Sequence, residues 1–311
     1  MRIAQLYRQG QAVANRPGLV ISLELFPPKS DDAEALLFRQ TLPQLLALRP
    51  SFFSVTYGAG GGTRERTLRI ASRIQQQFGV TSMAHLTCTG QSRHTIAAVL
   101  DEAHNLGLEN ILALRGDPPR GQTHFTTEPD GFAHATDLIR FIRNHYSFSI
   151  GAAFYPEGHQ EAPDKYRDWD YAALKVEAGA EFLISQLFYV AEDFIECVEY
   201  LRHRRGVNVP LVPGILPFLS KEQIRRFTQM CGARLPAEIN RRLDQLDEDE
   251  SVRRFGVEVC TELCMRLISY GVPGIHIYCL NRVESARELL SNLGLVPASR
   301  EDSARQEKAA L

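Results

Sequence analysis

One carboxylate stands inside an otherwise apolar run. Glu24 lies between Leu23 and Leu25 in the segment 19–26, which has the composition of a buried strand in a parallel sheet. Apolar surroundings favour the protonated carboxyl, so Glu24 could act as a general acid. The structural alternative is that alternation turns Glu24 away from both leucines, where it pairs with an arginine. We favour the catalytic role, because strands of parallel sheets are usually apolar on both faces.

Residues that can form hydrogen bonds, Gly116 through its backbone and the others through their side chains, also follow six further β-rich runs, each at the carboxyl end of the run. In chain order they are Thr56, Tyr57, His85, Thr87, Arg115, Gly116, Asp117, Tyr155, Glu157, His159, Gln186, Tyr278, Asn281 and Arg282. One such residue could arise by chance, but seven ends of this kind predict a polar pocket.

Three further patterns leave alternatives open. The glycine-rich loop 58–63 could cradle a phosphate with its backbone amides, or it could be a flexible active-site loop. Arg115 and Asp117 are two apart at a strand end, so they either pair with each other or face one ligand. Asp168 and Lys175 are seven apart, which places them on one helix face, where solvent exposure is the default.

Eight short β-rich runs recur along the chain, separated by segments with apolar residues at helical spacing. The predicted strands are 19–26, 52–56, 82–86, 110–114, 149–154, 182–186, 211–214 and 274–278. Alternating strands and helices form parallel βαβ units, and eight of them predict an α/β fold of the (β/α)8 TIM-barrel type. A doubly wound sheet is the alternative. In a barrel, the polar strand ends would share the opening where active sites lie.

The remaining segments favour a single domain. A short helix is expected within 1–18, and an extra helix within 235–250, in the long interval before the last strand. Residues 1–311 would then form one catalytic barrel with a frayed tail at 298–311.

Composition argues against several function classes. The 35 basic and 37 acidic residues are interspersed and give a net charge of −2, so neither nucleic acid nor an anionic membrane is an expected partner. Without a membrane-spanning run or a signal peptide, a cytoplasmic location is expected. No lysine lies in a predicted strand, which weakens a Schiff-base aldolase. The first strand carries no His-x-His and the cysteines form no C-x-x-C pair, so no metal site is predicted.

An ordered series of motifs resembles bacterial methylenetetrahydrofolate reductases of the short, FAD-dependent form along nearly the whole chain. The motifs are LELFPP from Leu23, SVTYGAGG from Ser54, HLTC from His85, ALRGD from Ala113, YPEGH from Tyr155, KVEAG from Lys175, PGILP from Pro213 and YCLNR from Tyr278. The resemblance implies a barrel with non-covalent FAD that accepts hydride from NADH or NADPH. It would reduce 5,10-methylenetetrahydrofolate to 5-methyltetrahydrofolate by ping-pong kinetics, in one-carbon metabolism and methionine synthesis.

The resemblance also implies roles for single residues. Glu24 matches the general acid, and Asp117 matches a carboxylate close to both flavin and pterin. The implied FAD contacts are Thr56, His85, Arg115, Gly116, Asp117, Ala153, Tyr155, His159, Asp168 and Lys175. The implied contacts with folate or nicotinamide are Glu24, Gln186, Gln223, Phe227, Tyr278 and Arg282, with Phe227 as a stacking surface.

Several properties stay open. The sequence does not distinguish NADH from NADPH, and it gives the loop 121–130 no role beyond a possible contact with the adenosine end. Family members commonly self-associate, so a homo-oligomer is expected, and no regulatory domain is expected after Leu295. Two other functions compete: a flavin-independent, folate-dependent methyl transfer or demethylation on the same barrel, and a ligand-binding barrel without turnover that needs no acid at Glu24.

Overall fold

A ring of parallel strands forms the centre of the fold. The computed structural model describes residues 1–9, 18–57, 64–116 and 127–297. The strands are β1 (Val20–Leu25), β2 (Phe52–Val55), β3 (Thr81–Thr87), β4 (Asn110–Leu114), β5 (Ser149–Phe154), β6 (Phe182–Ser185), β7 (Leu211–Val212), β8 (Gly214–Ile215) and β9 (Gly274–Ile277). They form one sheet in the order β7-β6-β5-β4-β3-β2-β1-β9-β8.

The ring closes because β7 and β8 occupy a single strand position. They are separated only by Pro213, which has no N–H to donate, and its carbonyl oxygen accepts from the His276 amide at 2.9 Å. On one side of this position β7 pairs with β6, and on the other β8 pairs with β9. Eight strand positions in a closed parallel ring confirm the predicted (β/α)8 barrel, so the doubly wound alternative is wrong.

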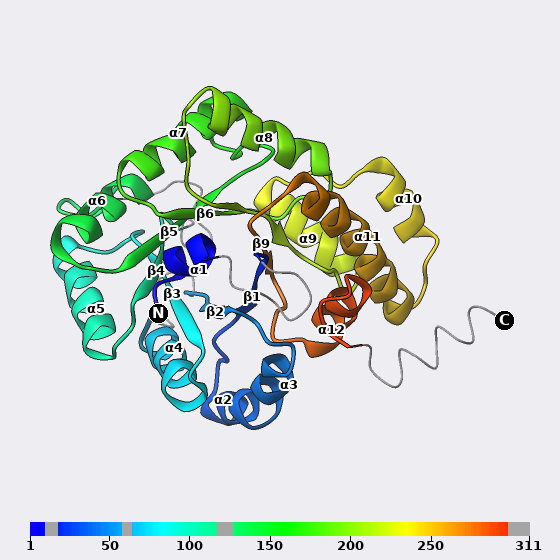
Figure 1. Cartoon of the computed structure of the whole chain (residues 1–311), viewed down its shortest axis with the longest axis horizontal. Coiled ribbons are helices and arrows are strands. Elements are labelled where there is room, and N and C mark those ends of the chain that lie inside the picture. The colour runs from blue at the N-terminus through cyan, green and yellow to red at the C-terminus, as the bar shows by residue number, and fades with distance from the viewer. Residues whose placement is uncertain (10–17, 58–63, 117–126, 298–311) are drawn as a thin grey trace.

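Helices surround the ring (Figure 1). They are α1 (Ile3–Gln9), α2 (Asp31–Leu36), the π-helical η1 (Leu37–Thr41), α3 (Leu42–Leu46), α4 (Arg64–Phe78), α5 (Arg93–Asn105), α6 (Ala135–His145), α7 (Lys165–Glu177), α8 (Ala191–His203), α9 (Lys221–Cys231), α10 (Ala237–Asp244), α11 (Asp249–Tyr270) and α12 (Val283–Asn292). The short helix expected near the N-terminus is α1, and the extra helix expected before the last strand is α10. The predicted tail at 298–311 lies outside the described residues.

The first helix fills the amino end of the barrel. Figure 1 shows α1 across the centre of the strand ring, and its Leu6 and Tyr7 pack with Phe52 and Phe182 in an apolar cluster inside the ring. The Ile3 amide donates to Oδ1 of Asn110, the first residue of β4, at 2.7 Å. Because this end is plugged, the opening at the carboxyl ends of the strands is left for a ligand.

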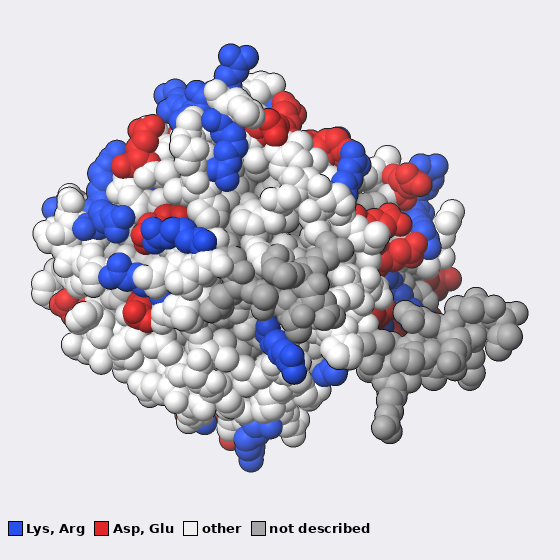
Figure 2. Space-filling model, viewed as in Figure 1, with Lys and Arg blue, Asp and Glu red and all other residues white. Residues whose placement is uncertain are grey.

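The charge distribution agrees with the balanced composition. On the face shown in Figure 2, blue and red side chains are interspersed around the margin, and the coloured part of that face has no broad area of one sign. Among the described residues, no helix combines the length and apolar character that crossing a bilayer requires.

Candidate active site

Glu24 lies near the carboxyl end of β1 and is 5% exposed. Its Oε2 is 3.3 Å from Nε2 of His276 and 3.5 Å from Nε2 of His85. The other nitrogen of His276, Nδ1, is 2.8 Å from the Ser22 hydroxyl. The carboxyl is therefore neither in purely apolar surroundings nor paired with an arginine, which were the two expectations. Ser22, His276 and Glu24 thus form a continuous series of side-chain contacts inside the barrel.

The two histidines beside Glu24 differ in their partners. A serine hydroxyl that donates to Nδ1 of His276 leaves the Nε2–H of that ring to donate to the carboxylate. Burial lowers the pKa of His85 to about 4, although the Glu24 charge acts in the opposite direction. Among the described residues, Nε2 of His85 has no partner with hydrogen-bond geometry. A neutral, buried ring with a free polar atom is suited to a ligand.

A second polar cluster joins the ends of β4 and β5 to α7. Asp164 caps α7 by accepting from the Arg167 amide at 2.9 Å, which sets the direction of the helix. Lys175 on α7 donates from Nζ to the Ala153 carbonyl oxygen at 2.8 Å. The Arg115 guanidinium forms two bonds with the Glu161 carboxylate, of 2.5 and 2.8 Å.

Burial changes the protonation equilibria of this cluster. It raises the pKa of Asp168, against the effect of Lys175 and His159. It also lowers the pKa of Lys175, against the effect of Asp168, and it lowers the pKa of His159. Asp168 is only 7% exposed, so the default of a solvated helix face is wrong for this pair. A charged ligand could stabilise the ionised forms that burial disfavours.

Backbone geometry shapes the floor of this cluster. Gly116 has a φ of 92°, and a Cβ on it would lie 2.6 Å from Oγ1 of Thr89, so this turn requires glycine. The Tyr155 ring stands perpendicular to His159 with centroids 4.7 Å apart, and its carbonyl oxygen accepts from Nε1 of the buried Trp169 at 3.0 Å. The Thr56 carbonyl oxygen accepts from the α4 hydroxyl of Thr67 at 2.8 Å.

Tyr278 lies beside the acid. Its hydroxyl donates to the Ser185 carbonyl oxygen at 2.6 Å, and its ring lies 5.1 Å from that of His276. Burial raises the pKa of Tyr278, and the charges of Glu24, Cys231 and Tyr155 act in the same direction. The ring therefore packs against the histidine that contacts Glu24.

The other predicted substrate contacts lie directly after β6, on α9 and directly before α12. Oε1 of Gln186 accepts from the Leu187 amide at 2.8 Å, and Oε1 of Gln223 accepts from the Leu219 amide at 2.6 Å. Phe227 on α9 is half-buried, with its ring on the core. Arg282 is exposed at the start of α12.

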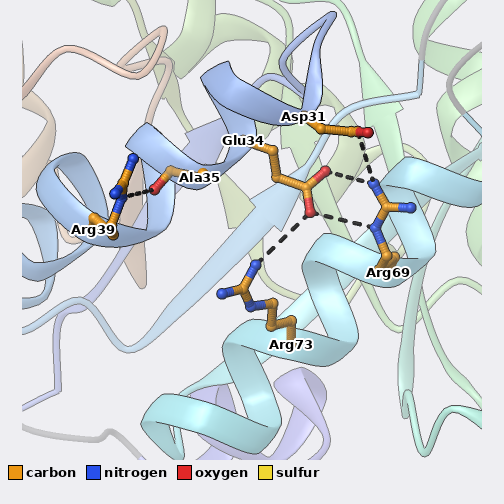
Figure 3. A pocket seen from close by; sticks show the side chains of 6 residues that line it. All are labelled: Asp31, Glu34, Ala35, Arg39, Arg69 and Arg73. Atoms are coloured by element: carbon orange, nitrogen blue, oxygen red, sulfur yellow. Dashed lines mark hydrogen bonds and ion pairs between the residues drawn. The ribbon is translucent and has the colours of Figure 1, made fainter.

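A separate pocket lies on the outer ring of helices (Figure 3). There the buried Glu34 of α2 accepts from Arg66 and Arg69 of α4 and lies 3.9 Å from Arg73. Asp31 adds a second carboxylate to Arg66 at 2.8 Å. The polar groups of this pocket join α2 to α4. The pocket shares no lining residue with the strand-end clusters.

A polar opening is general to barrel enzymes, and similarity to known proteins identifies the family. The family model described as Methylenetetrahydrofolate reductase matches residues 9–294. The chain belongs to the methylenetetrahydrofolate reductase family.

Individual members of the family match at moderate identity. The chain is 38% identical over 311 residues to "Methylenetetrahydrofolate reductase (NADH) 1" of Arabidopsis thaliana, with 96% of this chain and 51% of that protein covered. It is 33% identical over 293 residues to "5,10-methylenetetrahydrofolate reductase" of Escherichia coli K12, with 92% and 95% covered. The chain thus spans about half the length of the plant relative and nearly all of the bacterial one.

A solved structure supports the fold alone. An uncharacterized protein from Clostridium thermocellum, which binds two copies of 5-methyl-5,6,7,8-tetrahydrofolic acid, has a TM-score of 0.60 and 15% identity. The alignment covers 91% of this chain and 96% of that one.

Some predictions for this reductase-family chain fall outside the described residues. These are the role of Asp117 and the loop 58–63, together with residues 121–126 of the polar loop. Arg115 bonds to Glu161, a partner that was not predicted, while its relation to Asp117 stays a prediction.

Sequence reasoning missed several residues of the two polar clusters. His276 and Ser22 were not singled out, although each is a polar residue within a predicted apolar strand, the same signal that identified Glu24. Glu161 lies in a polar loop and had no distinguishing pattern. Asn281 was noted as a strand-end residue without a role.

Proposed function

We propose that this barrel reduces 5,10-methylenetetrahydrofolate to 5-methyltetrahydrofolate with electrons from NADH or NADPH, through non-covalently bound FAD. The observation that supports it most directly is the buried Glu24 carboxyl beside His276 at the carboxyl end of the ring, in a chain of this family. The Escherichia coli relative, covered over 95% of its length, bears this activity in its name. The names of plant relatives specify NADH, which favours NADH as the donor.

The residues present suit FAD. The β4–β5–α7 cluster offers Arg115 and Lys175 as donors for anionic oxygens, the His159 ring as a further polar group, and Asp168 as an acceptor for hydroxyl groups. Nε2 of His85 is buried and has no hydrogen-bond partner among the described residues. Following the resemblance to the family, we assign Thr56, His85, Arg115, Gly116, Asp117, Ala153, Tyr155, His159, Asp168 and Lys175 to FAD. When bound, FAD supplies the carrier that takes a hydride from the nicotinamide and gives one to the folate.

Glu24 would act as the general acid on the folate. A protonated carboxyl that loses its proton to the imidazolidine ring assists the opening of that ring to the iminium, which is the hydride acceptor. The His276 Nε2–H then stabilises the carboxylate that remains. Asp117, the second assigned catalytic residue, would stabilise the cationic iminium with its negative charge.

The remaining assignments concern substrate and assembly. Gln186, Gln223, Phe227, Tyr278 and Arg282 would contact folate or nicotinamide, with the half-buried Phe227 ring as a stacking surface. Use of one site by both substrates in turn predicts ping-pong kinetics. We further propose one catalytic domain, a cytoplasmic location and self-association into a homo-oligomer.

The visible absorption spectrum of the purified protein tests this function. A yellow protein whose flavin is bleached by NADH without oxygen, and recovers its colour with 5,10-methylenetetrahydrofolate, is the expected result. A protein that binds no added FAD yet demethylates or transfers a methyl group would support the flavin-independent alternative. Binding of folate without any turnover would support the ligand-binding alternative.

Glu24→Gln tests the assigned acid. It should keep the reduction of flavin by NADH and lose the transfer to folate, because only the second step uses the proton. Glu181→Gln is a matched control: this half-buried carboxylate accepts from the Ile150 amide at 3.2 Å and lies just before β6, at the opposite end of the barrel from the Glu24 carboxyl. Equal loss of both half-reactions in Glu24→Gln contradicts the role.

A further inference from the structure

The turn between β9 and α12 has an unusual backbone. Leu280 and Asn281 are adjacent, and their φ angles are 52° and 58°. Asparagine tolerates this left-handed region, whereas leucine is disfavoured there because its Cβ crowds the following carbonyl oxygen. Strain of this kind persists only where surrounding contacts maintain it, and it concentrates at functional sites.

Side chains of this turn contact the end of β1. Nδ2 of Asn281 donates to the Phe26 carbonyl oxygen at 2.8 Å, and the Phe26 amide donates to Oδ1 of Asn281 at 3.0 Å. The Cys279 thiol donates to the Glu24 carbonyl oxygen at 3.0 Å. The backbone is therefore held on both sides of Leu25.

These contacts lie where the strand ladder ends. On the β2 side, the ladder continues through Glu24 and Leu25. On the β9 side, its last pair is Leu23 with Ile277, one residue before the acid. The backbone of Glu24 thus has a strand neighbour on one side only, and the turn replaces the ladder on the other. The distance from its carboxyl to His276 depends on that backbone position.

We propose that Asn281 is a positioning residue for the acid. By holding both backbone groups of Phe26, it keeps the Glu24 carboxyl against His276 in the geometry that proton transfer to the folate needs. The role requires no contact between Asn281 and substrate, and it rests on the proposed reduction of 5,10-methylenetetrahydrofolate.

Asn281→Gly tests the role, since glycine accepts the same backbone conformation but lacks the amide. The rate of flavin oxidation by saturating 5,10-methylenetetrahydrofolate should fall about 100-fold, the usual cost of a catalytic group displaced by about 1 Å. Flavin reduction by NADH should be unchanged. The Kd of the folate should also stay close to its original value, because the carboxyl is misplaced while the folate contacts remain.

Two further variants serve as a control and as a graded rescue. Asn292→Ala removes an exposed amide that donates to Oγ1 of Thr261, and it should leave both half-reactions intact. Asn281→Asp has the donor and acceptor of the amide only when protonated, because a carboxylate cannot donate to the Phe26 carbonyl oxygen. The rate of flavin oxidation by 5,10-methylenetetrahydrofolate in Asn281→Asp, divided by the rate in the unmodified protein, should therefore rise as the pH is lowered. The same ratio for Asn281→Gly should not change with pH.

Failure of the positioning role and failure of the proposed function give different results. A normal folate rate in Asn281→Gly, an equal loss of both half-reactions, or an effect confined to the folate Kd overturns the positioning role. The positioning role is also overturned if the relative rate of flavin oxidation in Asn281→Asp does not depend on pH. This result counts even if Asn281→Gly does not fold. If the unmodified protein passes no hydride to 5,10-methylenetetrahydrofolate, the proposed function itself is refuted, before any variant is measured.

Discussion

Replacing His85 with asparagine should remove part of the acid sensitivity of the folded protein. Burial lowers the pKa of His85 from 6.5 to about 4. Between these two values the unfolded chain binds a proton that the folded protein does not. Stability contributed by this group is therefore complete above pH 6.5 and is lost progressively as the pH falls from 6.5 towards 4.

The size of the effect follows from the two pKa values. At pH 7.5 neither state is appreciably protonated at this ring, and at pH 5.0 the unfolded chain is almost fully protonated. The pH lies about 1.5 units below the unfolded pKa, and each unit is worth about 1.4 kcal/mol, so the unmodified protein loses about 2 kcal/mol through His85. His85→Asn should lose about 2 kcal/mol less between pH 7.5 and pH 5.0.

Urea unfolding at the two pH values measures the difference. The single tryptophan, Trp169, is fully buried, so its fluorescence can follow unfolding beside circular dichroism, and agreement of the two probes tests for a single transition. His203→Asn is the control, because the His203 ring is exposed beside Glu199. Full acid sensitivity in His85→Asn, or an equal reduction in His203→Asn, would refute the reasoning.

Three other substitutions separate cofactor binding, packing and the outer pocket. Lys175→Met removes the bond to the Ala153 carbonyl oxygen and should weaken the binding of FAD about tenfold or more. Flavin absorbance after dialysis measures the FAD that is retained, and full retention contradicts the assignment of Lys175 to FAD. Trp169→Phe leaves the Tyr155 carbonyl oxygen without its donor and should cost about 1–3 kcal/mol in urea unfolding, whereas unchanged stability argues against that bond. Glu34→Gln should cost about 2 kcal/mol, because its arginines lose their anion, yet both half-reactions should persist; their loss would place this pocket in the site.

The strands and their polar ends could be predicted because both signals are local. A short β-rich run bounded by turn residues defines each strand, and a glycine marks several helix ends. Gly271 is one such residue: its φ of 100° ends α11 in a conformation that other residues rarely adopt. The spacing of the strands also predicted α10, because the interval before β9 was too long for one helix.

The partners of the acid could not be predicted in the same way, because they depend on how the barrel closes. Glu24 and His276 are 252 residues apart, and they meet only because β1 pairs with β9. Ring closure implies that pairing, but not the register that places the two side chains together. Arg115 and Glu161 present the same difficulty, because Glu161 lies in a loop whose path no periodicity describes.

The two proposed half-reactions depend on different parts of this ring. All residues assigned to FAD lie in the range from Thr56 to Lys175, whereas the groups that contact β1 around the acid, His276, Cys279 and Asn281, lie near the end of the barrel sequence. A change near β9 can therefore misplace the acid while the flavin cluster stays intact. Among the described residues assigned to FAD, His85 lies beside Glu24, and Asp117 is assigned to both steps. Variants of Asn281 should therefore affect the folate step alone, whereas variants of His85 should affect both steps.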